Sequence, residues 1–219
     1  MTRVIAIDGP AGSGKSSVSR EVARRLGFGF LDTGAAYRAL TWWALDSELD
    51  LHDHDAIAAL LPDFPYSISL DPDLERVRVG EVEVTDAIRD PRISLNVSAI
   101  ATNPHVRPWM KDFTRSLADH AEYPGVVAEG RDMTTVVFPD ADTRILLTAR
   151  EEVRIARRAG ETAAAADVTA RSISDRDAKD STVVDFTTAA PGVAVIDSSD
   201  IGFDETVDAV VGLCTGGNA

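Results

Sequence analysis

The segment at residues 4–20, VIAIDGPAGSGKSSVSR, constrains the fold more than any other part of the chain. Its first four residues form an apolar, mostly β-branched run that is short enough for a buried strand. A glycine-rich loop follows, and from Ser17 to the residue before Gly27 nothing interrupts a helix. The sequence therefore predicts a strand, a tight loop and a helix in direct succession.

The loop itself matches the pattern G-x-x-x-x-G-K-[ST], which predicts a phosphate-binding loop. Backbone N–H groups of such a loop can surround phosphate oxygens, and the positive end of the following helix adds to the field. Lys15 is expected to bridge the outer phosphates, and the Ser16 hydroxyl to ligate Mg²⁺. An ordinary glycine-rich turn would explain the glycines but not the Lys-Ser pair at the helix start. The predicted loop residues are Gly9, Pro10, Ala11, Gly12, Ser13, Gly14, Lys15, Ser16 and Ser17.

Composition narrows the class of partner. The chain has 219 residues, enough for one domain with small insertions, and a net charge of −14. That charge disfavours a nucleic-acid polymer or an anionic membrane as a partner, but it allows a small anion held by a few arginines. A single cysteine, Cys214, excludes a disulfide within the chain and suits a reducing cytosol. No apolar run approaches the length of a membrane span, and the first residues show no signal-peptide pattern.

Apolar runs alternate with helical stretches along the chain, a pattern typical of a parallel α/β protein. Strands are predicted over residues 4–7, 29–31, 126–128, 144–147 and 193–196. Helices are predicted over residues 15–26, 35–46, 108–120, 151–158, 168–175 and 204–213. Residues 62–103 interrupt the alternation and are interpreted as a small antiparallel insertion that ends in a polar, helix-like stretch. A polar, alanine-rich segment at about 159–182 predicts a surface helical hairpin or a lid.

Two further motifs follow predicted strands. In LDTGAAYR, Asp32 and Thr33 come directly after a strand, and Tyr37 and Arg38 lie one turn into a helix. A simple capped helix, with Arg38 as a solvated surface charge, is the alternative. In VVAEGRDM, Glu129 ends a strand at a place where an acid can reach the water shell of Mg²⁺ in a P-loop protein. A surface turn explains that octapeptide equally well.

Five segments together resemble the bacterial-type cytidylate kinases, and they occur in the order of that family. They are IDGPAGSGKSS, LDTGAAYR, EVTDAIR, EGRDMTTVVFPDA and DRDAKDST. The resemblance implies a kinase that phosphorylates CMP or dCMP from ATP with Mg²⁺. It implies an α/β P-loop NTPase fold with a parallel five-stranded sheet and helices on both faces. The core would comprise residues 1–61 and 104–219, including the lid at about 159–182, with an inserted nucleoside-monophosphate-binding subdomain at 62–103.

Roles carried over from the family fall into three groups. The implied catalytic residues are Lys15, Arg131, Arg158, Arg176 and Asp180. The implied CMP site consists of Asp32, Thr33, Tyr37, Arg38, Ser98, Arg107, Gly130, Arg131, Asp132, Arg176 and Asp180. Within it, Arg38 and Arg131 would grip the phosphate, and Ser98, Arg107 and Asp132 would read the cytosine edge. Arg154 and Arg157 would join the ATP site, although a solvated helix face is the alternative for them and for Arg158. Ser16, and Glu129 through water, would hold the metal ion.

The sequence departs from the family pattern after DRDAKDST. Val183 stands at a position where an arginine is expected, and no proline-leucine pair follows. The lid is shorter than usual, and Glu129 replaces the more common aspartate. One alternative function is a small-molecule P-loop kinase that acts on UMP, AMP or a non-nucleotide. A second alternative is a P-loop ATPase switch, although the sequence lacks the N-K-x-D motif of GTPase switches and the L-S-G-G-Q motif of transporter ATPases. The expected protein is a cytoplasmic monomer whose partners are ATP, CMP and dCMP.

Overall fold

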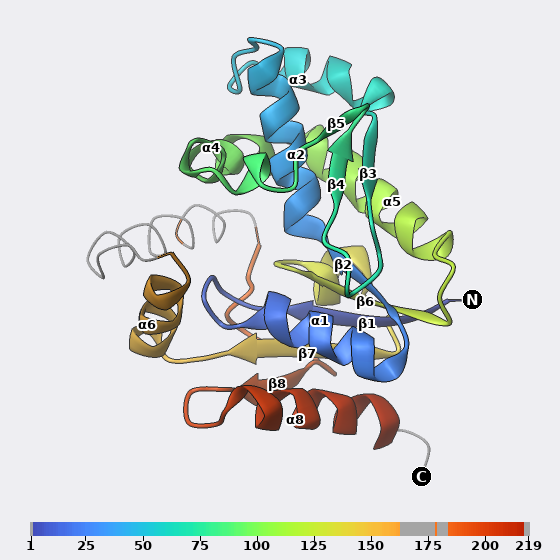
Figure 1. The fold of residues 1–219 in the computed structure, drawn as a ribbon, viewed down its shortest axis with the longest axis vertical. Coiled ribbons are helices and arrows are strands. Elements are labelled where there is room, and N and C mark those ends of the chain that lie inside the picture. Colours follow the sequence, from blue (N-terminus) through green and yellow to red (C-terminus); the bar gives the residue numbers. More distant parts are fainter. Residues whose placement is uncertain (1, 163–177, 179–183, 217–219) are drawn as a thin grey trace.

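A computed structural model describes residues 2–162, 178 and 184–216, with the side chains of residues 158, 161 and 162 left out of that description. Its centre is a parallel five-stranded sheet in the order β2-β6-β1-β7-β8 (Figure 1). The strands are β1 (Arg3–Asp8), β2 (Gly29–Asp32), β6 (Gly125–Gly130), β7 (Thr143–Thr148) and β8 (Ala194–Asp197). All five predicted strands are confirmed, with ends that move by one or two residues.

The side chains of β1 alternate between two helical layers, because successive residues of a strand point to opposite faces. Ile5 and Ile7 pack with α1 (Lys15–Leu26) and α8 (Phe203–Thr215) on one face. Ala6 packs on the other face with the end of α5 (Val106–Asp119) and a π-helix, Met133–Val137. A further helix, α6 (Glu151–Thr162), follows β7 directly. The predicted three-layer α/β architecture is therefore confirmed.

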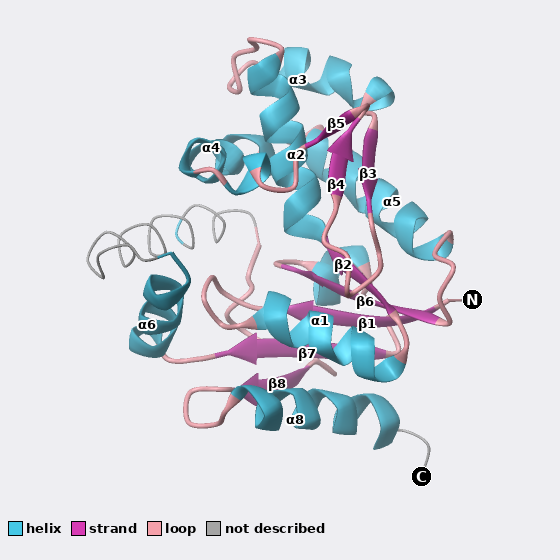
Figure 2. Ribbon diagram, in the orientation of Figure 1, coloured by secondary structure: helices cyan, strands magenta, loops and turns pink. Residues whose placement is uncertain are grey.

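A second group of elements lies beyond β2, an edge strand of the large sheet (Figure 2). Its antiparallel sheet has three strands, β3 (Tyr66–Ile68), β4 (Val77–Val79) and β5 (Val82–Glu83). The helices around it are α2 (Thr33–Asp46), α3 (His54–Leu60), α4 (Pro91–Ala101) and the first half of α5. Short 3-10 turns at Leu61–Asp63 and Ala87–Arg89 connect them.

The hydrophobic core of this second group extends beyond the predicted insertion at residues 62–103. Leu40 of α2, Ile57 of α3 and Met110 of α5 are buried in the same cluster as Val77 and Ile100. An aromatic stack adds to it, in which the rings of Trp43 and Phe64 lie 5.5 Å apart. The insertion therefore buries its apolar side chains against helices that precede and follow it, which fixes it beside the β2 edge of the large sheet.

The glycine-rich loop between β1 and α1 requires glycine at several positions, and Gly14 has a φ of +84° at the start of the helix. Gly12 has a φ of +76°, a conformation that side chains rarely adopt. A side chain on Gly9 would meet the carbonyl oxygen of Leu147 at 2.2 Å. The loop therefore lies close against β7 and turns sharply into α1. Within residues 2–162 and 184–216, no helix has the length and apolar composition that crossing a membrane requires.

The predicted helices over 15–26, 35–46, 108–120, 151–158 and 204–213 are present, with α6 extending to Thr162. The helix predicted over 168–175 and most of the predicted lid lie outside the described residues. The sequence analysis did not predict α3 or the π-helix. Both are short, and the π-helix is held by a tertiary contact from Asp8 rather than by any local pattern.

Candidate active site

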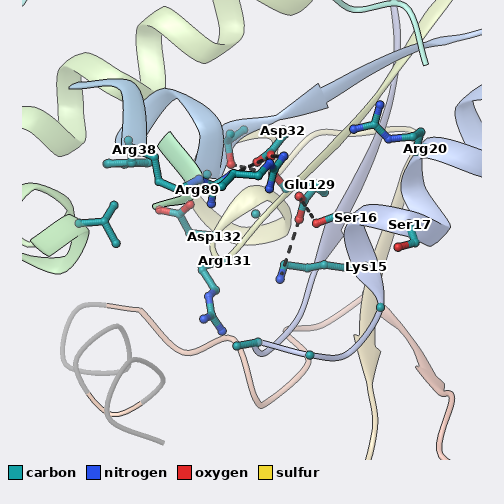
Figure 3. Close-up of a pocket in the computed structure, with 18 of the residues that line it drawn as sticks. Lys15, Ser16, Ser17, Arg20, Asp32, Arg38, Arg89, Glu129, Arg131 and Asp132 are labelled. Atoms are coloured by element: carbon teal, nitrogen blue, oxygen red, sulfur yellow. Dashed lines mark hydrogen bonds and ion pairs between the residues drawn. The ribbon is translucent and has the colours of Figure 1, made fainter. Parts of the chain in front are cut away.

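A cavity of about 630 Å³ lies between the glycine-rich loop and the second group of elements. Because parallel strands end at a common edge, the residues that follow β1, β2 and β6 all reach this cavity. Figure 3 shows Arg38 and Arg89 beside Asp32, with Lys15 and Ser16 across from them next to Glu129. The cavity therefore has a loop side and an α2 side.

On the loop side, Glu129 connects the end of β6 to the start of α1. Ser16 Oγ donates a hydrogen bond of 2.7 Å to Glu129 Oε1, and Lys15 Nζ lies 3.9 Å from Glu129 Oε2. Burial raises the pKa of Glu129, and the nearby Asp32 raises it further, while Lys15 and the Ser16 hydrogen bond act against that shift. The buried carboxylate thus lies beside a hydroxyl and an ammonium group at the base of the cavity.

On the α2 side, Asp32 organises two arginines. Asp32 Oδ1 caps α2 by accepting a 2.9 Å hydrogen bond from the backbone of Ala35. Its Oδ2 accepts a 2.9 Å hydrogen bond from Arg38 and lies 3.7 Å from Arg89. Burial favours a raised pKa for Asp32, but the charges of Arg38 and Arg89, together with the Ala35 hydrogen bond and Lys15, outweigh it and lower the pKa. The side chain of Arg38 is only 11% exposed, which is inconsistent with the alternative of a solvated surface charge.

Between the two sides, the turn after β6 presents Arg131 and Asp132. Arg107 Nη2 donates a hydrogen bond of 2.5 Å to Asp132 Oδ2. Burial raises the pKa of Asp132, and the opposing effect of Arg107 does not cancel it. Arg131 Nη1 donates a 3.3 Å hydrogen bond to the Gly9 carbonyl oxygen, and Figure 3 shows its guanidinium group turned toward the glycine-rich loop.

Asp8 fixes the position of this turn. Its carboxylate accepts hydrogen bonds from the backbone N–H groups of Met133 and Thr134, both at 2.8 Å, and from the Thr134 hydroxyl at 2.6 Å. Burial raises the pKa of Asp8, and the three hydrogen bonds lower it by less. The end of β1 therefore holds the π-helix that begins directly after Arg131 and Asp132.

Most residues predicted from sequence line this one cavity. They are Ala11, Gly12, Gly14, Lys15, Ser16, Ser17, Asp32, Thr33, Tyr37, Arg38, Arg107, Glu129, Gly130, Arg131 and Asp132. Gly9, Pro10 and Ser13 belong to the loop but do not line the cavity. Ser98 is buried in α4 and also does not line it, although its neighbour Val97 does.

The arginines of α6 lie against the glycine-rich loop rather than on a fully solvated face. Arg154 Nη1 donates a 2.9 Å hydrogen bond to the Ala11 carbonyl oxygen. Arg157 donates to the hydroxyl and the carbonyl oxygen of Ser198, at 2.9 and 2.7 Å. The side chain of Arg158 is outside the described part of the chain, as are Arg176, Asp180 and Val183. Their predicted roles stay predictions.

Sequence reasoning missed several residues that line the cavity, chiefly Arg20, Glu75 and Arg89. Glu75 forms ion pairs with Arg89 and, at 3.2 Å, with Arg20, so it joins α1 to the small sheet and to the α2 side. The sequence does contain a signal for Arg89, because this residue ends the EVTDAIR segment on which the family resemblance partly depends. Arg20 and Glu75 carry no motif and become visible only in the fold.

Known proteins match this chain over almost its whole length. A family model described as cytidylate kinase matches residues 5–215. Proteins named cytidylate kinase from Streptomyces avermitilis and Bdellovibrio bacteriovorus are each 42% identical over 212 residues, covering 96% of this chain and 91% and 97% of theirs. Another from Cutibacterium acnes is 44% identical over 218 residues, with 96% and 95% coverage. A crystal structure of TT1252 from Thermus thermophilus shares the fold at 17% identity, with a TM-score of 0.51 and coverage of 100% and 98%.

Proposed function

The chain belongs to the cytidylate kinase family, and from that premise we propose that it transfers the γ-phosphoryl group of ATP to a phosphate oxygen of CMP or dCMP. The observation that carries the proposal is the convergence of Lys15, Arg38 and Arg131 on one cavity beside a phosphate-binding loop. Two polyanions repel each other, and fixed cations on both sides of one cavity offset that repulsion.

The loop side suits the donor nucleotide. The backbone from Gly12 to Ser16 and the start of α1 would surround the phosphates, with Lys15 reaching the outer ones. The Ser16 hydroxyl and the Glu129 carboxylate are hard oxygen donors 2.7 Å apart, which fits Mg²⁺ held by few protein ligands together with phosphates and water. Among the described residues, no cluster of three His, Cys, Asp or Glu side chains offers a metal site made by the protein alone.

Ser16 would then ligate the ion directly and Glu129 would hold it through water. When bound with ATP, Mg²⁺ neutralises charge that develops on the transferring phosphoryl group. Lys15 and the loop amides act on the same charge from the protein side, and their positions are set before substrate arrives. The loop side therefore contributes preorganised positive potential, which is the main catalytic requirement in phosphoryl transfer.

The α2 side suits the acceptor. Arg38 and Arg89, both held by Asp32, would grip the monophosphate, and Arg131 would lie between acceptor and donor. The Asp132 carboxylate would accept a hydrogen bond from the exocyclic amine of cytosine, while Arg107 holds that carboxylate in place. Uracil carries a carbonyl oxygen at that position, so an ionised Asp132 would disfavour it.

Catalysis then requires positioning and electrostatics but no strong general base, because the acceptor phosphate is already anionic. The small-molecule kinases for UMP or AMP and the ATPase switch are both less consistent with the family match. The monomeric state and the cytoplasmic location expected from the sequence stay predictions, as do the domain limits.

A coupled assay of ADP release tests the proposal directly. The purified chain would be given ATP with CMP, dCMP, UMP or AMP in separate reactions, with a reaction lacking acceptor as a control. We expect turnover with CMP and dCMP, much less with UMP and AMP, and almost none without acceptor. The Lys15→Ala variant should lose activity in every reaction. Equal turnover with all four acceptors, or turnover that needs none, would contradict the proposal.

A further inference from the structure

The ring of Phe186 lies over the guanidinium group of Arg131. Arg131 Cζ is 4.3 Å from the ring centroid, and the phenylalanine is only 2% exposed. Phe186 lies just after Val183, in the stretch VVDFTTA, where the sequence departs from the family pattern. No motif in the sequence points to it, so the contact is a property of the tertiary structure.

A hydrogen-bonded turn holds the backbone on both sides of Phe186. Asp185 Oδ1 accepts three hydrogen bonds of 2.9 Å, from the N–H groups of Thr187 and Thr188 and from the Thr187 hydroxyl. These hydrogen bonds lower the pKa of Asp185 to about 2, so the carboxylate stays ionised across the physiological range. The residues on both sides of the aromatic ring are therefore held by a charge-assisted turn.

Arginine has several rotatable bonds, and holding its head group in one place costs conformational entropy. An aromatic face attracts the cation without taking up its N–H groups, because the attraction comes from the ring quadrupole. The edges of the guanidinium group stay available for hydrogen bonds in its own plane. Arg131 already uses one of them, at 3.3 Å, toward Gly9 of the phosphate-binding loop.

We infer that Phe186 is a positioning residue for phosphoryl transfer, which places the Arg131 guanidinium between donor and acceptor phosphates by a cation–π contact. This inference rests on the proposed function. It assigns a purpose to a stretch of sequence that lacks the proline-leucine pair of the family pattern. The ring acts on Arg131 and not on a substrate, so its loss should affect the rate of the chemical step more than the affinity for ATP.

A structural role in packing is the competing explanation, since Phe186 is among the most deeply buried large side chains. A leucine substitution alone would not separate the two roles. Replacing the phenylalanine with 4-fluoro-, 3,5-difluoro- and 3,4,5-trifluorophenylalanine nearly preserves its shape while it progressively weakens the negative potential of the ring face. The same series at Phe138 provides a matched control, because Arg115 lies over that buried ring at 5.5 Å outside the cavity.

The experiment measures kcat, the KM values for CMP and ATP, and urea unfolding for the wild type and each fluorinated variant. We expect kcat to fall stepwise with fluorination at Phe186, reaching about tenfold in the trifluoro variant, with the KM for ATP almost unchanged. Fluorination at Phe138 should leave kcat unchanged. In an Arg131→Gln background, measured by single turnover, the trend at Phe186 should vanish because the cation is gone.

A flat kcat across the Phe186 series, or a fall that persists in the Arg131→Gln background, would overturn the inference and leave the proposed function intact. Failure of the wild type to phosphorylate any nucleoside monophosphate would instead overturn the proposed function and this inference with it. The assay of the wild-type protein with CMP, dCMP, UMP and AMP is therefore carried out first.

Discussion

The hydroxyl of Ser16 and the carboxylate of Glu129 are joined by a hydrogen bond of 2.7 Å, although 113 positions separate them in the chain. This contact ties the start of α1 to the end of β6 at the base of the cavity. It brings together the two oxygen donors that the proposed function assigns to the metal ion.

Replacing Glu129 with glutamine should lower activity about 10- to 100-fold, because an outer-sphere partner of a metal site has an effect of that size. The dependence of the rate on Mg²⁺ concentration should shift to higher concentrations. Glu129→Asp is the matched control, since it keeps the charge and shortens the reach, and it should retain more activity. Mg²⁺ titrations of the initial rate would measure both, and an unchanged titration in Glu129→Gln would argue against the assignment.

Removing the guanidinium group of Arg131 should reduce kcat by about 100-fold or more, as expected for a group that stabilises transition-state charge. The protein should remain folded, because its side chain lies at the cavity and not in a hydrophobic cluster. Steady-state kinetics and circular dichroism of Arg131→Ala would test this. Arg92→Ala, at an exposed position of α4, is the control. Near-normal CMP phosphorylation by Arg131→Ala would exclude its proposed role.

Arg89, which is not among the site residues predicted from the sequence, is expected to contribute to acceptor binding. Its ion pairs with Asp32 and Glu75 direct it into the cavity from the small 3-10 turn. We expect Arg89→Ala to raise the KM for CMP about tenfold, through loss of one charge-assisted contact, and to leave the KM for ATP nearly unchanged. Arg76→Ala, which removes an exposed arginine paired with Glu83 at 3.7 Å, should change neither constant.

The raised pKa of Asp132 predicts how nucleobase preference depends on pH. Burial makes this carboxylate protonate at a higher pH than its ordinary value of 3.8. As the pH falls through the raised pKa, the group loses its charge, accepts a hydrogen bond from the cytosine amine more weakly, and gains a hydroxyl that can donate to the carbonyl oxygen of uracil. The ratio of kcat/KM for CMP over UMP should therefore decrease in acid and level off at higher pH. Asp132→Asn should show a low ratio that no longer follows pH, and a wild-type ratio independent of pH would contradict the reading role.

Asp8 should matter for stability and activity together. Asp8→Ala leaves the N–H groups of Met133 and Thr134 and the Thr134 hydroxyl without their buried acceptor, which should lower the free energy of unfolding by about 2–4 kcal/mol. Asp142→Ala, which removes an exposed acceptor for the Val4 N–H, should cost less than about 1 kcal/mol. Urea denaturation with parallel activity measurements would compare them.

The pH dependence of that difference has a definite sign. Burial raises the pKa of Asp8 above 3.8, so the folded state holds this proton more tightly than the unfolded state. The contribution of Asp8 to the free energy of unfolding is fully present below pH 3.8 and is lost as the pH rises through the raised pKa. The gap in unfolding free energy between wild type and Asp8→Ala should therefore narrow as the pH increases, and a gap that widens would contradict the assignment.

Local sequence patterns were sufficient to predict the phosphate-binding loop and the strands of the large sheet. An apolar run followed by Gly9, Gly14, Lys15 and Ser16 has few physical solutions, since only a strand, a tight loop and a helix satisfy that backbone and that charge. The order of apolar runs likewise predicted the five parallel strands, because β1, β2, β6 and β7 are largely buried on both faces and read as continuous apolar runs. These features depend on neighbours in sequence, and the chain alone determined them.

The tertiary structure decided which charges meet. Glu75 joins Arg20 to Arg89, Asp8 holds the turn that carries Arg131, and Phe186 covers Arg131. Each of these contacts links segments far apart in the chain and leaves no periodic pattern. Their partners are selected by strand order and by the packing of the inserted region on α2 and α5, and such long-range choices are not encoded in the spacing of neighbouring residues.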